Sequence, residues 1–107
     1  MPRCCMTLDL KDDPKLIAEY REYHERVWPE VLHSLKDAGI EDMEIYLFGN
    51  RLVMILDTCE GFSFDEKLKA DAKNPKVCEW EELMGKYQQS LPMSQKRWQQ
   101  MDRVFKL

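Results

Sequence analysis

The sequence lacks the segments that place a chain in a membrane or on nucleic acid. No apolar run reaches the about 18 residues that a membrane span needs, and charged residues such as Asp9, Lys11 and Asp12 occur before any signal-type segment develops. Sixteen Lys and Arg against 20 Asp and Glu give a net charge of -4, and no basic run exceeds a pair. We therefore expect a cytoplasmic protein whose partners include neither nucleic acid nor a membrane.

Motifs for metals, phosphate and nucleophilic catalysis are also missing. The four cysteines, at positions 4, 5, 59 and 78, form no paired C-x-x-C motif and no disulfide-rich pattern. No Gly-rich phosphate loop or nucleophile elbow is present. The sequence thus predicts reduced thiols and neither a metal nor a cofactor.

The first half of the chain predicts a strand, a broken helix and a hairpin. Residues 3–10 alternate as a strand does, and Asp13-Pro14 is a typical helix start. Apolar residues then recur at helical spacing until Gly39, but Pro29 removes one backbone hydrogen bond and predicts a kink or a restart of the helix near Trp28. Residues 44–48 and 52–56 are strand-like and are joined by Gly49-Asn50, which predicts a tight hairpin.

The second half predicts two helices and a short final strand or tail. Ser63 with Glu66 forms a capping box, Asn74-Pro75 opens another helix, and the chain after Pro92 is polar until residues 104–107. We expect one domain, residues 1–107, with an α+β, ferredoxin-like β-α-β-β-α-β sandwich. Because residues 52–56 are apolar on both faces, the sheet face without helices is expected to pack on a second copy.

Tyr20 and His24 are the first candidates for chemistry. They lie four residues apart in the apolar stripe of the predicted helix, so their polar tips point inward on one face. An interior tyrosine and histidine bonded to backbone groups would give the same pattern, and the pair alone does not decide between structure and catalysis.

Three further residues extend this candidate site. Tyr46 shares a strand face with Glu44 and Phe48, and it would converge on the pair if that face meets the first helix. Trp80 offers a flat apolar surface that suits either a core or the CH-rich face of a sugar ring. Glu81 and its acidic neighbours are consecutive helix residues that do not face one another, which favours a solvated face over a carboxylate pair.

The sequence resembles the L-rhamnose mutarotase family. The resemblance rests on the block Tyr20-Arg-Glu-Tyr-His24-Glu-Arg-Val-Trp28-Pro29-Glu30, on Ile45-Tyr46-Leu47, on Trp80-Glu-Glu-Leu-Met84 and on Val104-Phe105. It runs from the first strand to the C-terminus.

The resemblance implies a fold of the dimeric α+β barrel type, a homodimer, and a monosaccharide substrate handled without a cofactor. His24 would be the proton donor, and Tyr20, Tyr46 and Trp80 would contact the sugar. Glu81 stands where bacterial rhamnose enzymes carry a second tryptophan, so it is expected at the sugar and leaves the sugar's identity open. The predicted reaction exchanges the α and β anomers of a 6-deoxy-hexose such as L-rhamnose.

Three alternatives remain at this stage. The same scaffold would serve an L-fucose mutarotase. A small haem-binding or oxygenase-like protein of similar topology would use His24 as an iron ligand. A non-enzymatic module would only hold a metabolite between Tyr20, His24 and Tyr46.

Overall fold

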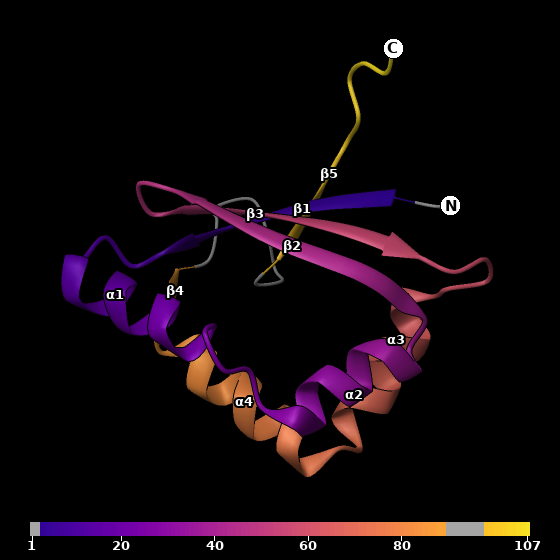
Figure 1. Cartoon of the computed structure of the whole chain (residues 1–107), viewed down its shortest axis with the longest axis horizontal. Coiled ribbons are helices and arrows are strands. Elements are labelled where there is room, and N and C mark those ends of the chain that lie inside the picture. The colour runs from indigo at the N-terminus through magenta and orange to yellow at the C-terminus, as the bar shows by residue number, and fades with distance from the viewer. Residues whose placement is uncertain (1–2, 90–97) are drawn as a thin grey trace.

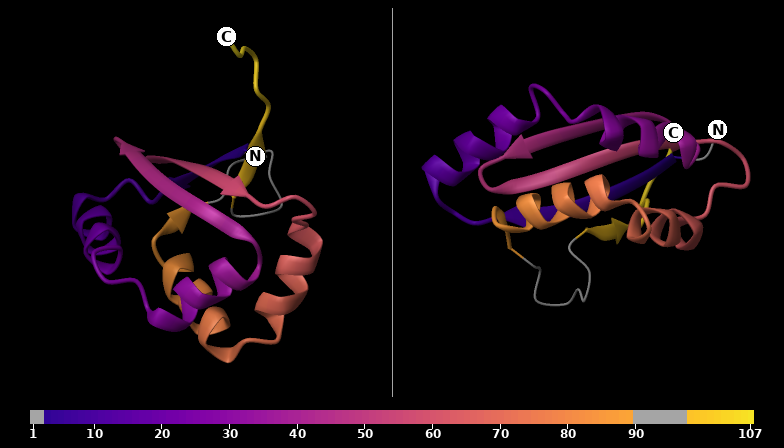
Figure 2. Two further views of the ribbon diagram at one scale, coloured as in Figure 1. Left: turned by 45° about the vertical axis from the view of Figure 1, so that its right-hand side comes forward. Right: turned by 90° about the horizontal axis from the view of Figure 1, so that it is seen from below.

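A computed structural model of the chain describes residues 3–89 and 98–107. It has two layers, with the four helices together on one face of an antiparallel sheet (Figures 1 and 2). In chain order, the elements are β1 (Arg3–Leu10), α1 (Pro14–Tyr23), α2 (Pro29–Asp37), β2 (Ile40–Phe48), β3 (Arg51–Thr58), α3 (Phe64–Ala72), α4 (Pro75–Gly85), β4 (Gln88–Gln89) and β5 (Gln99–Met101).

The sheet places β3 and β1 at its centre and β2 at one edge. Its strand order is β2-β3-β1-β4, and β5 also pairs with β1, so the two short strands share the edge opposite β2. Gly49, with φ +62°, turns the chain between β2 and β3. The hairpin expected at Gly49-Asn50 is confirmed, and its strands extend beyond the predicted ends because their ladders continue to Ile40 and Thr58.

Three helices begin at the side-chain caps that the sequence predicts. Asp13 accepts hydrogen bonds from two backbone N–H groups of α1, and Asn74 does the same for α4. Ser63 accepts one from Glu66 at the start of α3. These bonds satisfy donors that the first turn of a helix leaves without partners.

Of the kink or restart expected near Trp28, the structure shows the restart. The helix stops at Tyr23, residues 24–28 form turns, and a second helix starts at Pro29. Trp28 is extended, with φ -58° and ψ 137°, which is the conformation that a following proline imposes.

The core lies between the sheet and the helices. The inner sheet face contributes alternate residues of the three long strands, and α1, α2 and α4 cover it. Its most deeply buried members are Leu8, Leu10, Leu52 and Leu56, with Tyr20, Trp80 and Met84 packed from the helices. No helix within residues 3–89 and 98–107 is long and apolar enough to cross a membrane.

Of the two forms expected for residues 104–107, the structure shows the tail. The last strand is Gln99–Met101, whereas residues 104–107, expected as an edge strand or a tail, form no ladder within the described residues. Pro92, where the irregular segment was expected to begin, lies outside the described residues. The short strand β4 was not predicted, because two glutamines carry no strand pattern.

Gly39 should tolerate no side chain. Its φ is +100°, and an added Cβ would lie 2.5 Å from Cys59 Sγ. Replacing Gly39 by Ala should lower the free energy of unfolding by about 2–4 kcal/mol, because backbone strain and a steric clash add. Urea denaturation measures this change.

Gly61→Ala is the matched control for this change, since Gly61 also has a positive φ, +83°, but open space around it. It should cost only the backbone strain, about 1–2 kcal/mol. Equal losses at the two glycines would contradict the clash with Cys59.

Candidate active site

The break after α1 determines the position of His24. His24 is the C-cap of α1, and its backbone N–H bonds to the Arg21 carbonyl rather than to the Tyr20 carbonyl four residues back. Tyr20 O instead lies 2.8 Å from Nδ1 of the His24 ring. The ring nitrogen therefore replaces the backbone N–H that would bond to the Tyr20 carbonyl inside a helix.

This bond also determines which ring nitrogen is basic. A carbonyl oxygen can only accept, so Nδ1 carries the proton in the bond to Tyr20 O. In the neutral ring, Nε2 is then the nitrogen that accepts a proton. His24 thus presents one nitrogen for proton exchange.

Aromatic rings surround His24. The Tyr20 ring lies 4.3 Å from the His24 ring between centroids, and Trp80 approaches edge-on at 5.6 Å. Trp28 and Tyr23 pack on Trp80 at 5.2 and 6.4 Å. Because Trp80 is only 6% exposed, it is a core residue that also forms one wall of the site.

Burial lowers the pKa of His24 below its ordinary value, and the bond to the Tyr20 carbonyl opposes that shift. The aromatic neighbours exclude water from the ring, and this loss of solvation disfavours the charged imidazolium. Neutral His24 is therefore the main form at neutral pH, and its protonated form is a stronger acid than a free histidine.

Tyr20 is a hydrogen-bonding group rather than a proton source. Burial raises its pKa to about 12, with the charge of Glu81 adding to the rise and a hydrogen bond from Gln88 opposing it. Gln88 Oε1 is a buried acceptor without a partner among the described residues. Because buried polar atoms are nearly always hydrogen-bonded, this oxygen can accept a hydrogen bond from a ligand hydroxyl beside Tyr20.

Three of the five predicted site residues come together and a fourth lies near them. Tyr20, His24 and Trp80 are in contact, and Glu81, exposed on α4, is close enough to raise the pKa of Tyr20. Tyr23, Trp28, Tyr87 and Gln88 were not predicted as site residues. Only the Trp28-Pro29 signal within the sequence block could have indicated any of them.

Tyr46, also predicted at the site, lies away from the other predicted site residues. Its neighbours Ile45 and Leu47 point into the core, so Tyr46 lies on the opposite sheet face, 54% exposed. Its hydroxyl donates to Glu44 Oε2 at 2.7 Å. The condition for Tyr46 to converge on the pair is therefore not met within one chain, because its face does not meet the first helix.

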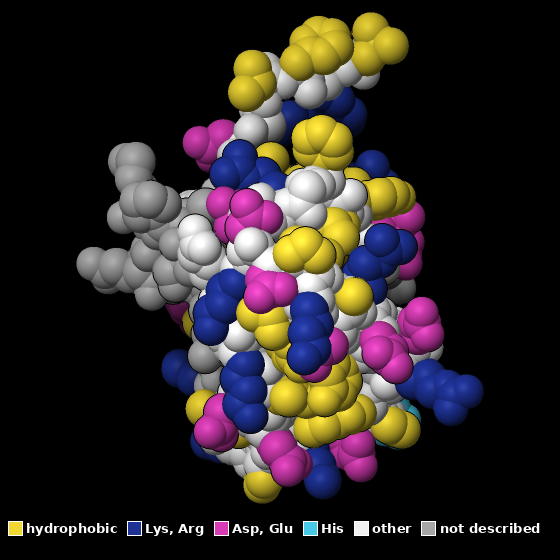
Figure 3. All heavy atoms as spheres, turned by 90° about the vertical axis from the view of Figure 1, so that its left-hand side faces the viewer, with side chains coloured by type: hydrophobic (Ala, Val, Ile, Leu, Met, Phe, Trp, Pro, Cys, Tyr) yellow, Lys and Arg dark blue, Asp and Glu magenta, His cyan; other side chains and the backbone are white. Residues whose placement is uncertain are grey.

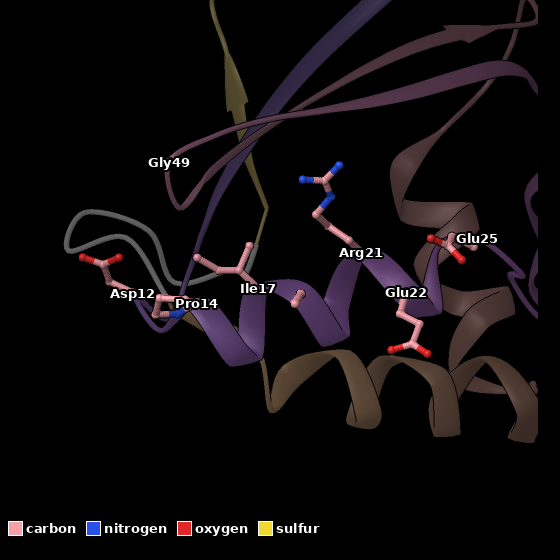
Figure 4. Close-up of a pocket in the computed structure, with 8 residues that line it drawn as sticks. Asp12, Pro14, Ile17, Arg21, Glu22, Glu25 and Gly49 are labelled. Carbon is pink, nitrogen blue, oxygen red and sulfur yellow. The ribbon is translucent and has the colours of Figure 1, made fainter.

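An open hollow of about 750 Å³ runs along α1 beside the site (Figure 4). It lies between α1 and the hairpin tip at Gly49, and Ile17 and Arg21 project into it from α1. His24 is not part of its lining, but Arg21 and Glu25, on either side of His24 in the sequence, are.

The cysteines are free, as expected from their spacing. Cys4 packs on the core cluster on the inner face, and its neighbour Cys5 therefore lies on the other face. Within residues 3–89 and 98–107, no three His, Cys, Asp or Glu side chains are grouped so that they could hold a metal ion.

The antiparallel sheet with its helices on one face defines a ferredoxin-like α+β protein. Two solved structures share this fold over at least 98% of the chain: an L-rhamnose mutarotase from Formosa agariphila, with a TM-score of 0.74 and 23% identity, and a dimeric ferredoxin-like protein from an uncultured marine organism, with a TM-score of 0.55 and 15% identity. The matched regions cover 99% and 90% of those two chains, respectively.

Sequence comparison gives the family. The family model described as L-rhamnose mutarotase matches residues 3–107. A protein of Xanthomonas campestris named L-fucose mutarotase is 42% identical over 111 residues, covering 100% of this chain and 89% of that protein. The chain belongs to the L-rhamnose mutarotase family, a family of isomerases.

The free energy of unfolding should decrease as the pH falls through the range in which His24 becomes protonated. Because its pKa is lowered in the folded state, the unfolded chain binds more protons just below the ordinary value of about 6.5. The free energy of unfolding should therefore decrease as the pH falls from 7 through about 6 to 5. Urea titrations at successive pH values measure the slope.

The His24→Gln variant should show a flatter profile over the same range, since glutamine does not titrate. The Asp57 carboxylate, whose pKa its bond to Arg3 lowers, loses its contribution only at lower pH, below about 4. An unchanged slope in His24→Gln would contradict the lowered pKa of His24.

Proposed function

We propose that the protein interconverts the α and β anomers of a 6-deoxy-hexose such as L-rhamnose, with His24 as the proton donor. The observation that supports this most is the bond between His24 Nδ1 and the Tyr20 carbonyl, because it leaves Nε2 as the exchangeable position. Membership in a mutarotase family supplies the reaction class.

The proposed chemistry needs one group that first donates and then accepts a proton. Protonated His24 delivers its Nε2 proton to the ring oxygen as the bond from that oxygen to C1 breaks. Neutral His24 then takes the proton of the anomeric hydroxyl, which leaves the open-chain aldehyde. Rotation about the bond between C1 and C2 and reversal of both steps give the other anomer.

The surrounding residues bind the sugar. Trp80 and Trp28 form the apolar wall. Gln88 Oε1 accepts a hydrogen bond from one sugar hydroxyl, while Tyr20 and Glu81 lie close enough to orient others. General acid–base help of this kind contributes about 10²- to 10⁴-fold.

Both L-rhamnose and L-fucose are candidate substrates, since the family model carries one name and the Xanthomonas campestris relative the other. We place the protein in the cytoplasm, where the four free thiols would stay reduced. The haem-binding alternative is not favoured, because the mutarotase model extends over residues 3–107.

We also propose that two copies pair through the outer sheet face, defined by Cys5, Thr7, Tyr46, Phe48, Val53 and Ile55. Phe48 is 90% exposed on this face, which the helices leave bare. A face of this composition is typical of an interface between protein chains. A fold neighbour whose title calls it dimeric supports the pairing.

Replacing His24 by Ala should abolish catalysed anomer exchange, because no other group within the described site donates a proton at neutral pH. Saturation-transfer NMR on L-rhamnose and L-fucose measures the exchange rate. His33→Ala is the control, since His33 is exposed on α2 and should leave the rate unchanged. Retained exchange in His24→Ala would exclude His24 as the donor.

Replacing Tyr20 by Phe should lower kcat/KM by about 10- to 100-fold, since a charge-neutral hydrogen bond to the sugar contributes about 1–3 kcal/mol. Tyr46→Phe loses the same hydroxyl from the outer face and should keep the normal rate. The same NMR assay compares them. Equal losses in both variants would contradict the placement of Tyr46 away from the sugar.

A further inference from the structure

Gln88 carries a buried polar atom that the fold leaves unpaired. Among residues 3–89 and 98–107, its Oε1 is the single buried side-chain nitrogen or oxygen without a hydrogen-bond partner. Polar groups on the surface have water instead: Figure 3 shows Lys, Arg, Asp and Glu side chains spread over one face, where solvent reaches them. A buried carbonyl oxygen without a partner costs stability. Such an atom indicates a place where a ligand supplies the missing hydrogen.

The strand ladder places Gln88 on the inner face of the sheet. In the pairing of β4 with β1, Gln88 lies opposite Leu10, and Gln89 lies opposite Asp9. Residues directly opposite each other in a ladder share a face. Because Leu10 is a core residue, 1% exposed, Gln88 points under the helices toward Tyr20. Gln89 points to the outer face and is exposed.

Gln88 also determines what the Tyr20 hydroxyl can do. The side-chain amide of Gln88 bonds to that hydroxyl, and because an N–H can only donate, the phenol oxygen accepts. The Tyr20 O–H is then left to donate to another group. Side by side, the two residues present one donor, the Tyr20 O–H, and one acceptor, Gln88 Oε1. Sugar hydroxyls, which both donate and accept, match this arrangement.

We propose that Gln88 is the specificity-determining residue of the site: together with Tyr20 it holds one sugar hydroxyl on C2, C3 or C4, and it selects for sugars that carry this hydroxyl. The inference rests on the anomer exchange proposed above. It adds which part of the sugar is held and which sugars are rejected.

The chemistry of anomer exchange explains why the held hydroxyl is not the anomeric one. The bond between C1 and the ring oxygen breaks and C1 turns, so the anomeric hydroxyl lies in different positions in the two anomers. The hydroxyls on C2, C3 and C4 keep their configuration throughout. A hydroxyl of this group, held by Gln88 and Tyr20, keeps the open-chain sugar beside His24 while C1 turns.

The same contact gives selectivity. A sugar without the held hydroxyl would bring a C–H group against Gln88 Oε1 and leave that oxygen buried and unpaired. A site built to hydrogen-bond a hydroxyl discriminates strongly against an analogue that lacks it, for this reason. An apolar wall such as Trp80 discriminates far less between sugars of similar shape.

The test combines one variant with a series of deoxy sugars. Gln88→Met keeps the length of the side chain and removes both amide bonds. On L-rhamnose or L-fucose, whichever is exchanged faster, it should lower kcat/KM by about 10- to 100-fold, measured by saturation-transfer NMR. Analogues of that sugar lacking the hydroxyl on C2, C3 or C4 locate the contact. For one of them, wild type and variant should differ by less than about 3-fold, because the held hydroxyl is already absent.

Gln89→Met is the matched control, since it removes the same amide from the outer face and should leave the rate on every sugar unchanged. Urea denaturation shows whether each variant is folded, and Gln88→Leu gives the same comparison if Gln88→Met is not. A normal rate of Gln88→Met on the parent sugar would overturn the inference. So would a loss that is equally large on all three deoxy sugars.

Binding measurements separate this inference from the proposed reaction. Amide-shift titrations by NMR give the Kd of each sugar for wild type and variants, whether or not anomers are exchanged. Binding that depends on Gln88 and on one hydroxyl, without anomer exchange, would overturn the reaction and support the contact. Normal binding and exchange in Gln88→Met would overturn the contact alone. A wild-type chain that binds none of these sugars would overturn both.

Discussion

The hydrogen bond between the His24 ring and the Tyr20 carbonyl is the interaction on which the site depends. It exists because α1 ends at Tyr23: the backbone N–H of His24 bonds to the Arg21 carbonyl and not to the Tyr20 carbonyl. The last carbonyls of a helix lack backbone partners, and the imidazole at the C-cap supplies one for Tyr20. The end of α1 thus sets the orientation of the ring and its tautomer.

The same break lets the aromatic shell close around His24. After the turn of residues 24–28, Trp28 packs on Trp80 of α4, and Trp80 in turn lies against His24. Asn74 and Pro75 start α4 at the point that allows this contact. The site is therefore assembled from two helix starts and one helix end, each determined by short-range sequence signals, on top of a sheet that supplies only apolar support.

Those short-range signals explain what the sequence could predict. The caps, the hairpin and the pairing of Tyr20 with His24 depend on residues a few positions apart. The side of Tyr46 stayed open because alternation separates Ile45 from Tyr46 without saying which of them the helices cover. Gln88 was missed because its proximity to Tyr20 arises from the packing of distant elements, which no local pattern encodes.

The degree of burial at His24 suits the proposed proton transfer. A lower pKa makes the imidazolium a stronger acid, but it also makes that form rarer at neutral pH. Complete burial would leave too little of the protonated form, whereas full exposure would give an ordinary acid. The bond to the Tyr20 carbonyl opposes the shift caused by burial, which limits how far the pKa falls. Because ring opening requires both donation and acceptance of a proton, the imidazole of His24 serves both directions better than the Tyr20 hydroxyl, whose pKa of about 12 excludes it.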